Sequence, residues 1–177
     1  MMNKVLLSIM AMFSLVFSTA CGQDNNKTEK AAAVDNKRLT SDILQQSTSI
    51  QFFTNNGTVA PDYHYNMTVV VTKDSVTLTV IKGYGNKAAY DQTAPLTAEQ
   101  YQQFIQQLAA LSVHNTDDEP IPTTGGPVES IRVLDGSKLL FGGSTGRSLT
   151  YDGDLSITFH DVLPNEMAQV FRHPLDL

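Results

Sequence analysis

Hydrophobic and polar residues alternate over two neighbouring stretches, residues 65–72 and 75–82. An alternation of period two is typical of a β-strand with one buried face. Only Lys73-Asp74 separates the stretches, and a two-residue connection joins antiparallel strands in a hairpin. The pattern therefore predicts a β-hairpin, with a further strand before it at residues 49–53 and a loop after it at residues 83–93.

A helical period replaces the alternation after Leu96. Thr97 and Gln100 have the spacing of a capping box, in which each side chain bonds the other's backbone at a helix start. Apolar residues then recur every three or four positions and fall on one face of a helix. This set comprises Tyr101, Phe104, Ile105, Leu108 and Leu111. The pattern predicts one long amphipathic helix that packs its apolar face on a sheet.

Strand patterns return in the second half of the chain. Asp135-Gly136 separates two apolar runs, and Asp-Gly in that position is a strong signal for a tight hairpin. Apolar residues alternate again over residues 155–159, which predicts a last strand. Pro164 suits the first turn of a short closing helix.

These elements predict an α+β fold. Strands joined by tight turns pair antiparallel, because parallel pairs need long crossovers. We expect an antiparallel β-sheet of about six to seven strands, with one long amphipathic helix packed on one face and a short C-terminal helix. The expected domain comprises residues 46–177. Residues 21–45 are too polar to form a core and are expected to be a flexible tether, with a short helix at residues 39–46.

Residues 1–20 have the order of a secretory signal peptide. Lys4 is the only charged residue there, an apolar run covers residues 5–17, and small residues follow. A transmembrane helix needs about 20 apolar residues, and this run is shorter. The single cysteine of the chain, Cys21, stands directly after the expected cleavage point.

The stretch Ser18-Thr19-Ala20-Cys21 resembles the lipobox of bacterial lipoproteins, in which the cysteine is lipidated and becomes the mature N-terminus. The resemblance covers the leader alone, and Ser18 departs from it, because an aliphatic residue is usual there. The same residues also fit the cleavage site of an ordinary secreted protein, which is the alternative. The resemblance implies that acyl chains on Cys21 anchor the protein to a membrane. Gly22 after the cysteine resembles outer-membrane sorting, so the expected location is the cell envelope, in the outer membrane facing the periplasm.

The net charge limits the classes of partner, and the cysteine content limits the sources of stability. The formal charge is −6, and it becomes −7 without residues 1–20, which hold Lys4 and no acidic residue. An acidic chain lacks the basic surface that nucleic acid requires, so no nucleic-acid partner is expected. Because no cysteine follows Cys21, stability has to come from a packed core without disulfides or thiolate metal sites.

One motif suggests an enzyme. The stretch Gly142-Gly143-Ser144-Thr145-Gly146 matches the G-x-S-x-G nucleophile elbow, which places a reactive serine between a strand and a helix. The residues after Gly146 predict a further turn and no helix. A hairpin loop is therefore the preferred interpretation, and an envelope serine hydrolase using Ser144 is the alternative.

An acidic loop offers candidate cation ligands. His114, Asp117, Asp118 and Glu119 place an imidazole and three carboxylates within six residues. A hard cation needs about six oxygen ligands in a defined geometry, which this loop lacks. A solvated loop is preferred, with a small-molecule or cation-binding lipoprotein as a further alternative. His160 is expected on the exposed side of a strand, and no metal or cofactor site is expected.

The order of the expected elements is similar to that of the emfourin-type protease inhibitors of bacteria, which have cystatin-like folds. The similarity spans residues 49–171 and consists of a strand, a loop, two strands, a capped helix and further strands. It implies a binding module and transfers no inhibitory residue. The sequence therefore favours a membrane-anchored envelope lipoprotein that is not an enzyme and binds a protein partner, as an inhibitor or an immunity-like factor.

Overall fold

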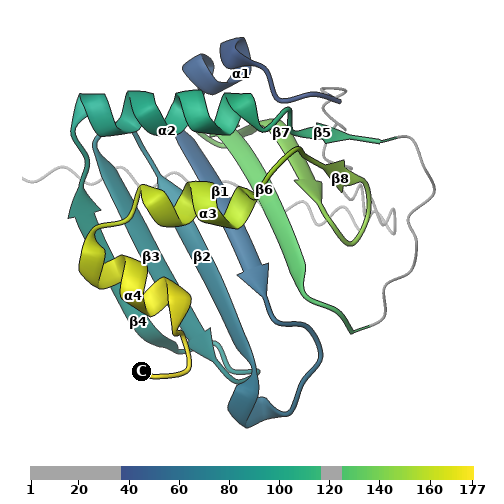
Figure 1. Cartoon of the computed structure of the whole chain (residues 1–177), viewed down its shortest axis with the longest axis vertical. Coiled ribbons are helices and arrows are strands. Elements are labelled where there is room, and N and C mark those ends of the chain that lie inside the picture. The colour runs from purple at the N-terminus through teal and green to yellow at the C-terminus, as the bar shows by residue number, and fades with distance from the viewer. Residues whose placement is uncertain (1–36, 117–124) are drawn as a thin grey trace, which may run out of the picture. The chain divides into compact units, whose positions relative to one another are not determined.

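Six antiparallel strands form the main sheet in the computed structural model, which describes residues 37–116 and 125–177. The strand order is β4-β3-β2-β1-β6-β7 (Figure 1). Their bounds are β1 Ser49–Asn55, β2 Tyr65–Val71, β3 Ser75–Lys82, β4 Ala88–Pro95, β6 Val128–Asp135 and β7 Lys138–Ser144. The predicted mixed fold with an antiparallel sheet is confirmed.

Both predicted hairpins are present. Val71 pairs with Val76 across the turn at residues 72–75, where the Thr72 hydroxyl lies 2.7 Å from the Asp74 carboxylate. Asp135 pairs with Lys138 across the second turn, in which Gly136 has a φ of +57°. Glycine adopts that left-handed conformation without the steric cost that a side chain imposes. These hairpins could be predicted because each depends on residues that are close in sequence.

The predicted loop at residues 83–93 is wrong over most of its length, because β4 begins at Ala88. β4 is an edge strand with mostly exposed side chains, so its sequence carries no alternation of apolar residues. Its pairing with β3 holds it in place. Two side-chain hydrogen bonds add to this pairing, one between the Thr77 and Thr93 hydroxyls at 2.8 Å and one from the Thr79 hydroxyl to the Asp91 carboxylate at 3.0 Å.

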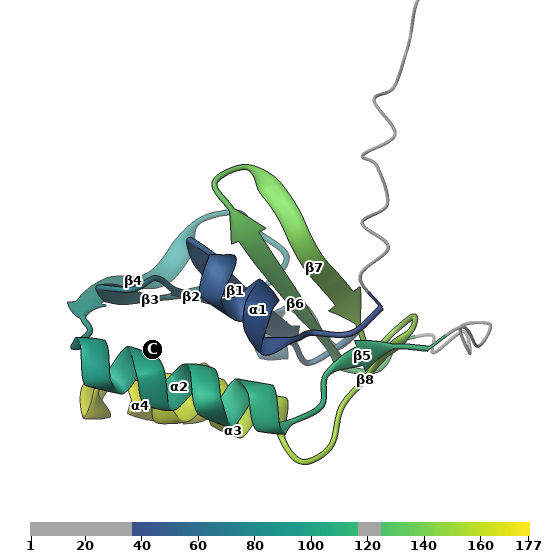
Figure 2. The same cartoon turned by 90° about the horizontal axis from the view of Figure 1, so that it is seen from above.

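Helices α2, α3 and α4 lie on one face of the sheet (Figures 1 and 2). The prediction of one long helix is not confirmed, since the described residues contain four α-helices and a short 3-10 turn. Their bounds are α1 Ser41–Gln46, η1 Pro61–Tyr63, α2 Ala98–Ala110, α3 Leu155–Asp161 and α4 Asn165–Arg172. The predicted capping box is present at the start of α2, formed by Thr97 and Gln100. None of the helices in the described ranges combines the length and apolar composition needed to cross a membrane.

The strand predicted at residues 155–159 is instead helix α3. The Asp154 side chain caps this helix by accepting a hydrogen bond from the Ile157 backbone N–H at 2.9 Å. Leu155 and Phe159, one helical turn apart, are buried, whereas Ile157 between them is 55% exposed. The alternation in the sequence therefore indicated the wrong secondary structure. The Asp154 cap and the burial of Leu155 and Phe159 favour the helix.

Four aromatic rings fix the helices on the sheet. Phe159 of α3 stacks on Phe52 of β1 with ring centroids 4.7 Å apart, and it meets Phe104 of α2 edge-on at 5.2 Å. Phe171 of α4 lies 6.4 Å from Phe52. Such pairs add about 0.5–1.5 kcal/mol each beyond the burial of their area. Phe52 therefore positions both α3 and α4.

The folded region begins before residue 46, the expected start of the domain. Leu39 donates its backbone N–H to the Val113 carbonyl at 2.8 Å. Leu39 and Leu44 are both buried in the core, Leu44 completely. The described part of the expected tether, residues 37–45, therefore belongs to the domain, because its two leucines complete the core.

A small second ribbon crosses the end of the β6–β7 hairpin. It pairs β5, His114–Asn115, with β8, Leu149–Thr150. The Asn115 amide donates to the Gly142 carbonyl at 3.0 Å. A Cβ atom on Gly143 would lie 2.7 Å from Leu149 Cδ1 and closer still to the Asn115 side-chain oxygen, so a larger residue would force these side chains to shift.

Candidate functional site

A row of three paired residues forms the floor of a cleft at one end of the sheet. Thr54 of β1 pairs with Met67 of β2 and with Glu129 of β6. All three face the helices, because they share the period-two register of the buried residues in their strands. The next row inward, which includes Phe52 and Ile131, is fully buried. Helices α3 and α4 cover that inner row and leave the outer one beside an opening.

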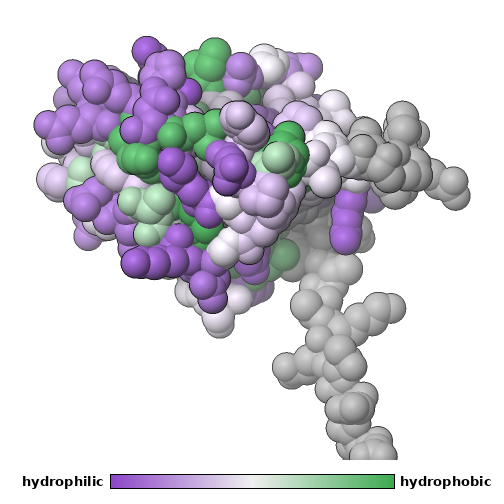
Figure 3. Space-filling model, turned by 90° about the horizontal axis from the view of Figure 1, so that it is seen from below, coloured by the Kyte–Doolittle hydropathy of each residue, from purple (hydrophilic) through white to green (hydrophobic). Residues whose placement is uncertain are grey.

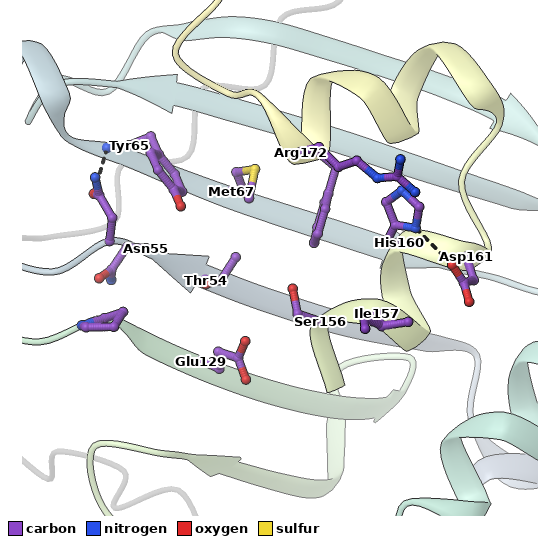
Figure 4. A pocket seen from close by; sticks show the side chains of 13 residues that line it. Thr54, Asn55, Tyr65, Met67, Glu129, Ser156, Ile157, His160, Asp161 and Arg172 are labelled. Atoms are coloured by element: carbon purple, nitrogen blue, oxygen red, sulfur yellow. Dashed lines mark hydrogen bonds and ion pairs between the residues drawn. The ribbon is translucent and has the colours of Figure 1, made fainter. Parts of the chain in front are cut away.

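The opening has a volume of about 730 Å³, within the common range of ligand sites. The ends of β1, β2 and β6 line one side of it, and α3 and α4 line the other (Figure 4). Tyr65, Met67, Pro127, Ile157 and Phe171 supply apolar surface. The polar lining consists of Thr54, Asn55, Asn56, Glu129, Ser156, His160, Asp161 and Arg172. Apolar surface with a few placed polar groups is typical of binding sites.

The β6 side of the cleft carries a half-buried carboxylate. Glu129 accepts a hydrogen bond from the Tyr151 hydroxyl. Burial, followed by this hydrogen bond and the negative charges of Glu129 and Asp154, raises the pKa of Tyr151 far above its ordinary value. A second hollow of about 340 Å³, lined by Tyr151 and Asp154, adjoins the cleft and shares Glu129 with it. This side therefore presents negative charge and holds its tyrosine neutral.

The opposite wall carries the basic groups. The His160 Nδ1 atom lies 2.9 Å from the Asp161 carboxylate, and its side chain is 14% exposed. The Nε2 atom is buried without a hydrogen-bond partner among the described residues. Arg172 of α4 lies beside this pair in Figure 4. Its guanidinium makes no ion pair within residues 37–116 and 125–177.

Exposed aromatic side chains lie at the same end of the sheet as the cleft. Tyr63 of η1 is 65% exposed, and Tyr84, in the connection from β3 to β4, is 57% exposed. Tyr84 stacks on the buried ring of His64 at 4.1 Å and donates its hydroxyl to the Val59 carbonyl at 2.6 Å. Figure 3 views the molecule from this end, where hydrophobic side chains emerge among hydrophilic ones.

The nucleophile elbow is not formed at Ser144. Ser144 ends β7, and its carbonyl accepts hydrogen bonds from Arg147 and Ser148 in a tight turn that leads into β8. An elbow requires a helix directly after the serine. No hydrogen bond joins the Ser144 side chain to any histidine in the described part of the chain.

The two other histidines considered from the sequence, His114 and His160, lie on different elements. His114 Nδ1 lies 2.8 Å from the Ser112 carbonyl in the β5 ribbon, and Asp117, Asp118 and Glu119 lie outside the described residues. No group of three or more possible metal ligands occurs within the described ranges. The expected exposure of His160 is wrong, because α3 is a helix and turns this side chain toward the cleft wall. Cys21 also lies outside the described residues.

Sequence reasoning missed the cleft and its charged residues. Glu129 had the one usable signal, since it precedes Ile131 and Val133 at the same strand period. A charge in the register of buried residues indicates a position where the core is open or the charge is partnered. No such signal marked Arg172, His160 or Ser156. They lie on helices, and a helical period does not show whether the facing part of the sheet is covered.

No protein-family model matches the chain, and no curated protein matches it either. The resemblances to bacterial lipoproteins and to emfourin-type inhibitors therefore remain expectations from the sequence.

Proposed function

We propose that the protein is a membrane-anchored lipoprotein of the bacterial cell envelope whose folded domain is a non-enzymatic binding module. Cys21 carries the lipid anchor, in the outer membrane on the periplasmic side. The observation that carries the binding role is the cleft, which the Glu129–Thr54–Met67 row of the inner sheet face lines beside α3 and α4. The rest of that face is closed by the core.

The surroundings of the cleft support a protein partner. Ile157, Tyr63 and Tyr84, three large exposed side chains, lie at its rim or at the same end of the sheet. Tyrosine is enriched at protein interfaces, because it offers apolar area together with a polar tip. The acidic net charge of −6 disfavours nucleic acid. A module of this kind acts by binding to its partner, as an inhibitor or an immunity-like factor does.

Site-specific photocross-linking in intact cells tests this proposal. The full chain carries p-benzoylphenylalanine in place of Ile157, which is exposed at the cleft, or in place of Thr93, which is exposed on the edge strand β4. We expect one discrete protein adduct from position 157 in the envelope fraction and none of that size from position 93. Identical adducts from both positions, or no adduct from position 157, would contradict a binding role for the cleft.

A further inference from the structure

We infer that the cleft binds an extended peptide segment with a basic side chain, an apolar side chain and an acidic group in succession. This inference rests on the proposed function, and it names the chemistry of the partner. The basic side chain pairs with Glu129, the apolar one lies over Met67 and Phe171, and the acidic group pairs with Arg172.

The first step concerns Glu129. Its side chain is half-buried on the inner sheet face, where the Tyr151 hydroxyl is its hydrogen-bond donor. No Lys or Arg pairs with it among the described residues. A partly buried carboxylate with one neutral donor retains acceptor capacity, and its attraction for a cation is stronger than that of a fully exposed acid. Asp154, beside the adjoining hollow, adds negative charge on the same side.

The second step concerns Arg172, which lines the cleft from α4. In Figure 4, Arg172 and Glu129 lie on opposite sides of Thr54 and Met67. Neither Arg172 nor Glu129 forms an ion pair with another residue in the described part of the chain. Arginine presents a planar set of donors that matches a carboxylate. Unpaired charges of opposite sign across one cleft complement a ligand that carries both signs.

The third step concerns the floor between the charges. Met67 is 3% exposed and Phe171 is 7% exposed, so these two residues offer an apolar surface of small area. Tyr65 and Ile157 lie beside this floor and add apolar contact for an aliphatic side chain. The Asn55 side-chain oxygen Oδ1 accepts from the Gly57 backbone N–H at 2.8 Å, and the Asn55 side-chain NH2 group can donate to a peptide carbonyl.

These features favour a peptide over an anionic lipid. An anionic lipid headgroup would pair with Arg172, but its negative charge would also meet the Glu129 carboxylate in the same cleft. Like charges at short range cost binding free energy. A peptide avoids this cost, because it carries a cation and an anion on separate residues.

An NMR titration with synthetic peptides tests the inference. The protein is the full chain with labelled methionine methyl groups, and Met67 is the reporter. The probe is acetyl-Ala-Lys-Leu-Glu-Ala-amide, and the matched peptide has Glu in place of Lys. We expect saturable shifts of Met67 with the first peptide and binding weaker by on the order of tenfold with the second, as for a lost charge-assisted hydrogen bond.

Variants assign the charges. E129Q keeps the shape and should remove the preference for Lys, whereas E129K should reverse it in favour of the Glu peptide. R172Q should weaken binding of both peptides and leave their ratio unchanged. E166Q, which removes an exposed charge on α4 outside the cleft lining, is the matched control and should leave both affinities unchanged.

Three outcomes would overturn the inference. These are equal binding of the two peptides, no shift of Met67 with either, or tighter binding to phosphatidylglycerol vesicles that E129Q strengthens. If the cross-link at position 157 forms while the peptides fail, the binding role of the cleft stands and its assigned chemistry is wrong.

Discussion

Glu129 and Tyr151 form a contact between distant parts of the sequence that defines the acidic side of the cleft. Glu129 occupies the first inward position of β6, ahead of buried Ile131, and the Tyr151 hydroxyl donates to it. The pKa of Tyr151 is raised chiefly by burial, then by this hydrogen bond and the nearby negative charge. The folded state therefore holds the phenol proton more tightly than the unfolded state does.

This shift predicts a loss of stability in alkali. A raised folded-state pKa contributes stability that is fully present below the unfolded value of about 10 and is lost as pH rises above it. The urea midpoint of the native chain should fall more steeply above about pH 10 than that of Y151F. A weaker dependence should remain in Y151F, because burial also raises the pKa of Tyr65.

Chemical denaturation monitored by circular dichroism, at about pH 8 and at several values above about pH 10, measures this difference. Y63F is the matched control, because Tyr63 is 65% exposed and makes no side-chain hydrogen bond in the described part of the chain. Parallel pH profiles for the native chain and Y151F would show that the Tyr151–Glu129 contact does not affect alkaline stability.

The formation of helix α3 depends on its N-terminal cap and on its packing against other elements. Its seven residues are too few for a stable isolated helix, so its stability depends on packing. Leu155 and Phe159 supply the packing, and Asp154 supplies the cap. The same helix holds Ile157 and His160 at the cleft, so the shape of the site depends on it.

D154A should therefore destabilise the domain and loosen the cleft wall. The loss of an N-cap side chain costs about 1 kcal/mol, so the free energy of unfolding should fall by that amount. Urea denaturation measures it, and amide hydrogen exchange should become faster within residues 155–161. D152A is the control, because the Asp152 carboxylate makes no hydrogen bond or ion pair in the described structure. Equal destabilisation by both variants would contradict the capping role.

At the scale of the whole molecule, the proposed lipid anchor and the proposed binding domain are separate in sequence. The expected lipidation site, Cys21, precedes the folded region that includes residues 37–116 and 125–177. The proposed anchor depends on the leader residues before Cys21, and the proposed binding role depends on the cleft. Each can therefore be tested without disturbing the other.

C21A should abolish incorporation of an alkyne-labelled palmitate analogue and release the protein from the membrane fraction. The native chain should incorporate the label, because Cys21 stands where the lipobox places the lipidated residue. S18L restores the aliphatic residue that the lipobox usually has, and it should incorporate at least as much label as the native chain. An unlabelled native chain alongside a labelled S18L variant would show that Ser18 directs ordinary secretion.

The local elements were predictable where their signals are short-range. The strands on either side of Lys73-Asp74, the Asp135-Gly136 hairpin and the Thr97 capping box each depend on residues a few positions apart. Strand β4 was not predictable in this way, because its side chains are mostly exposed and its partner strand defines it. For α3, the local alternation indicated a strand, and burial of Leu155 and Phe159 against other elements favoured the helix.

By itself, the sequence determined the antiparallel hairpins and the start of α2, because these depend on neighbouring residues. Only the tertiary structure decided where the sheet face stays open. The Glu129–Thr54–Met67 row comes from three strands, and α3 and α4 that border it come from the end of the chain. Which positions of a buried register the helices leave uncovered depends on helix length and packing angle, and no local pattern encodes those quantities.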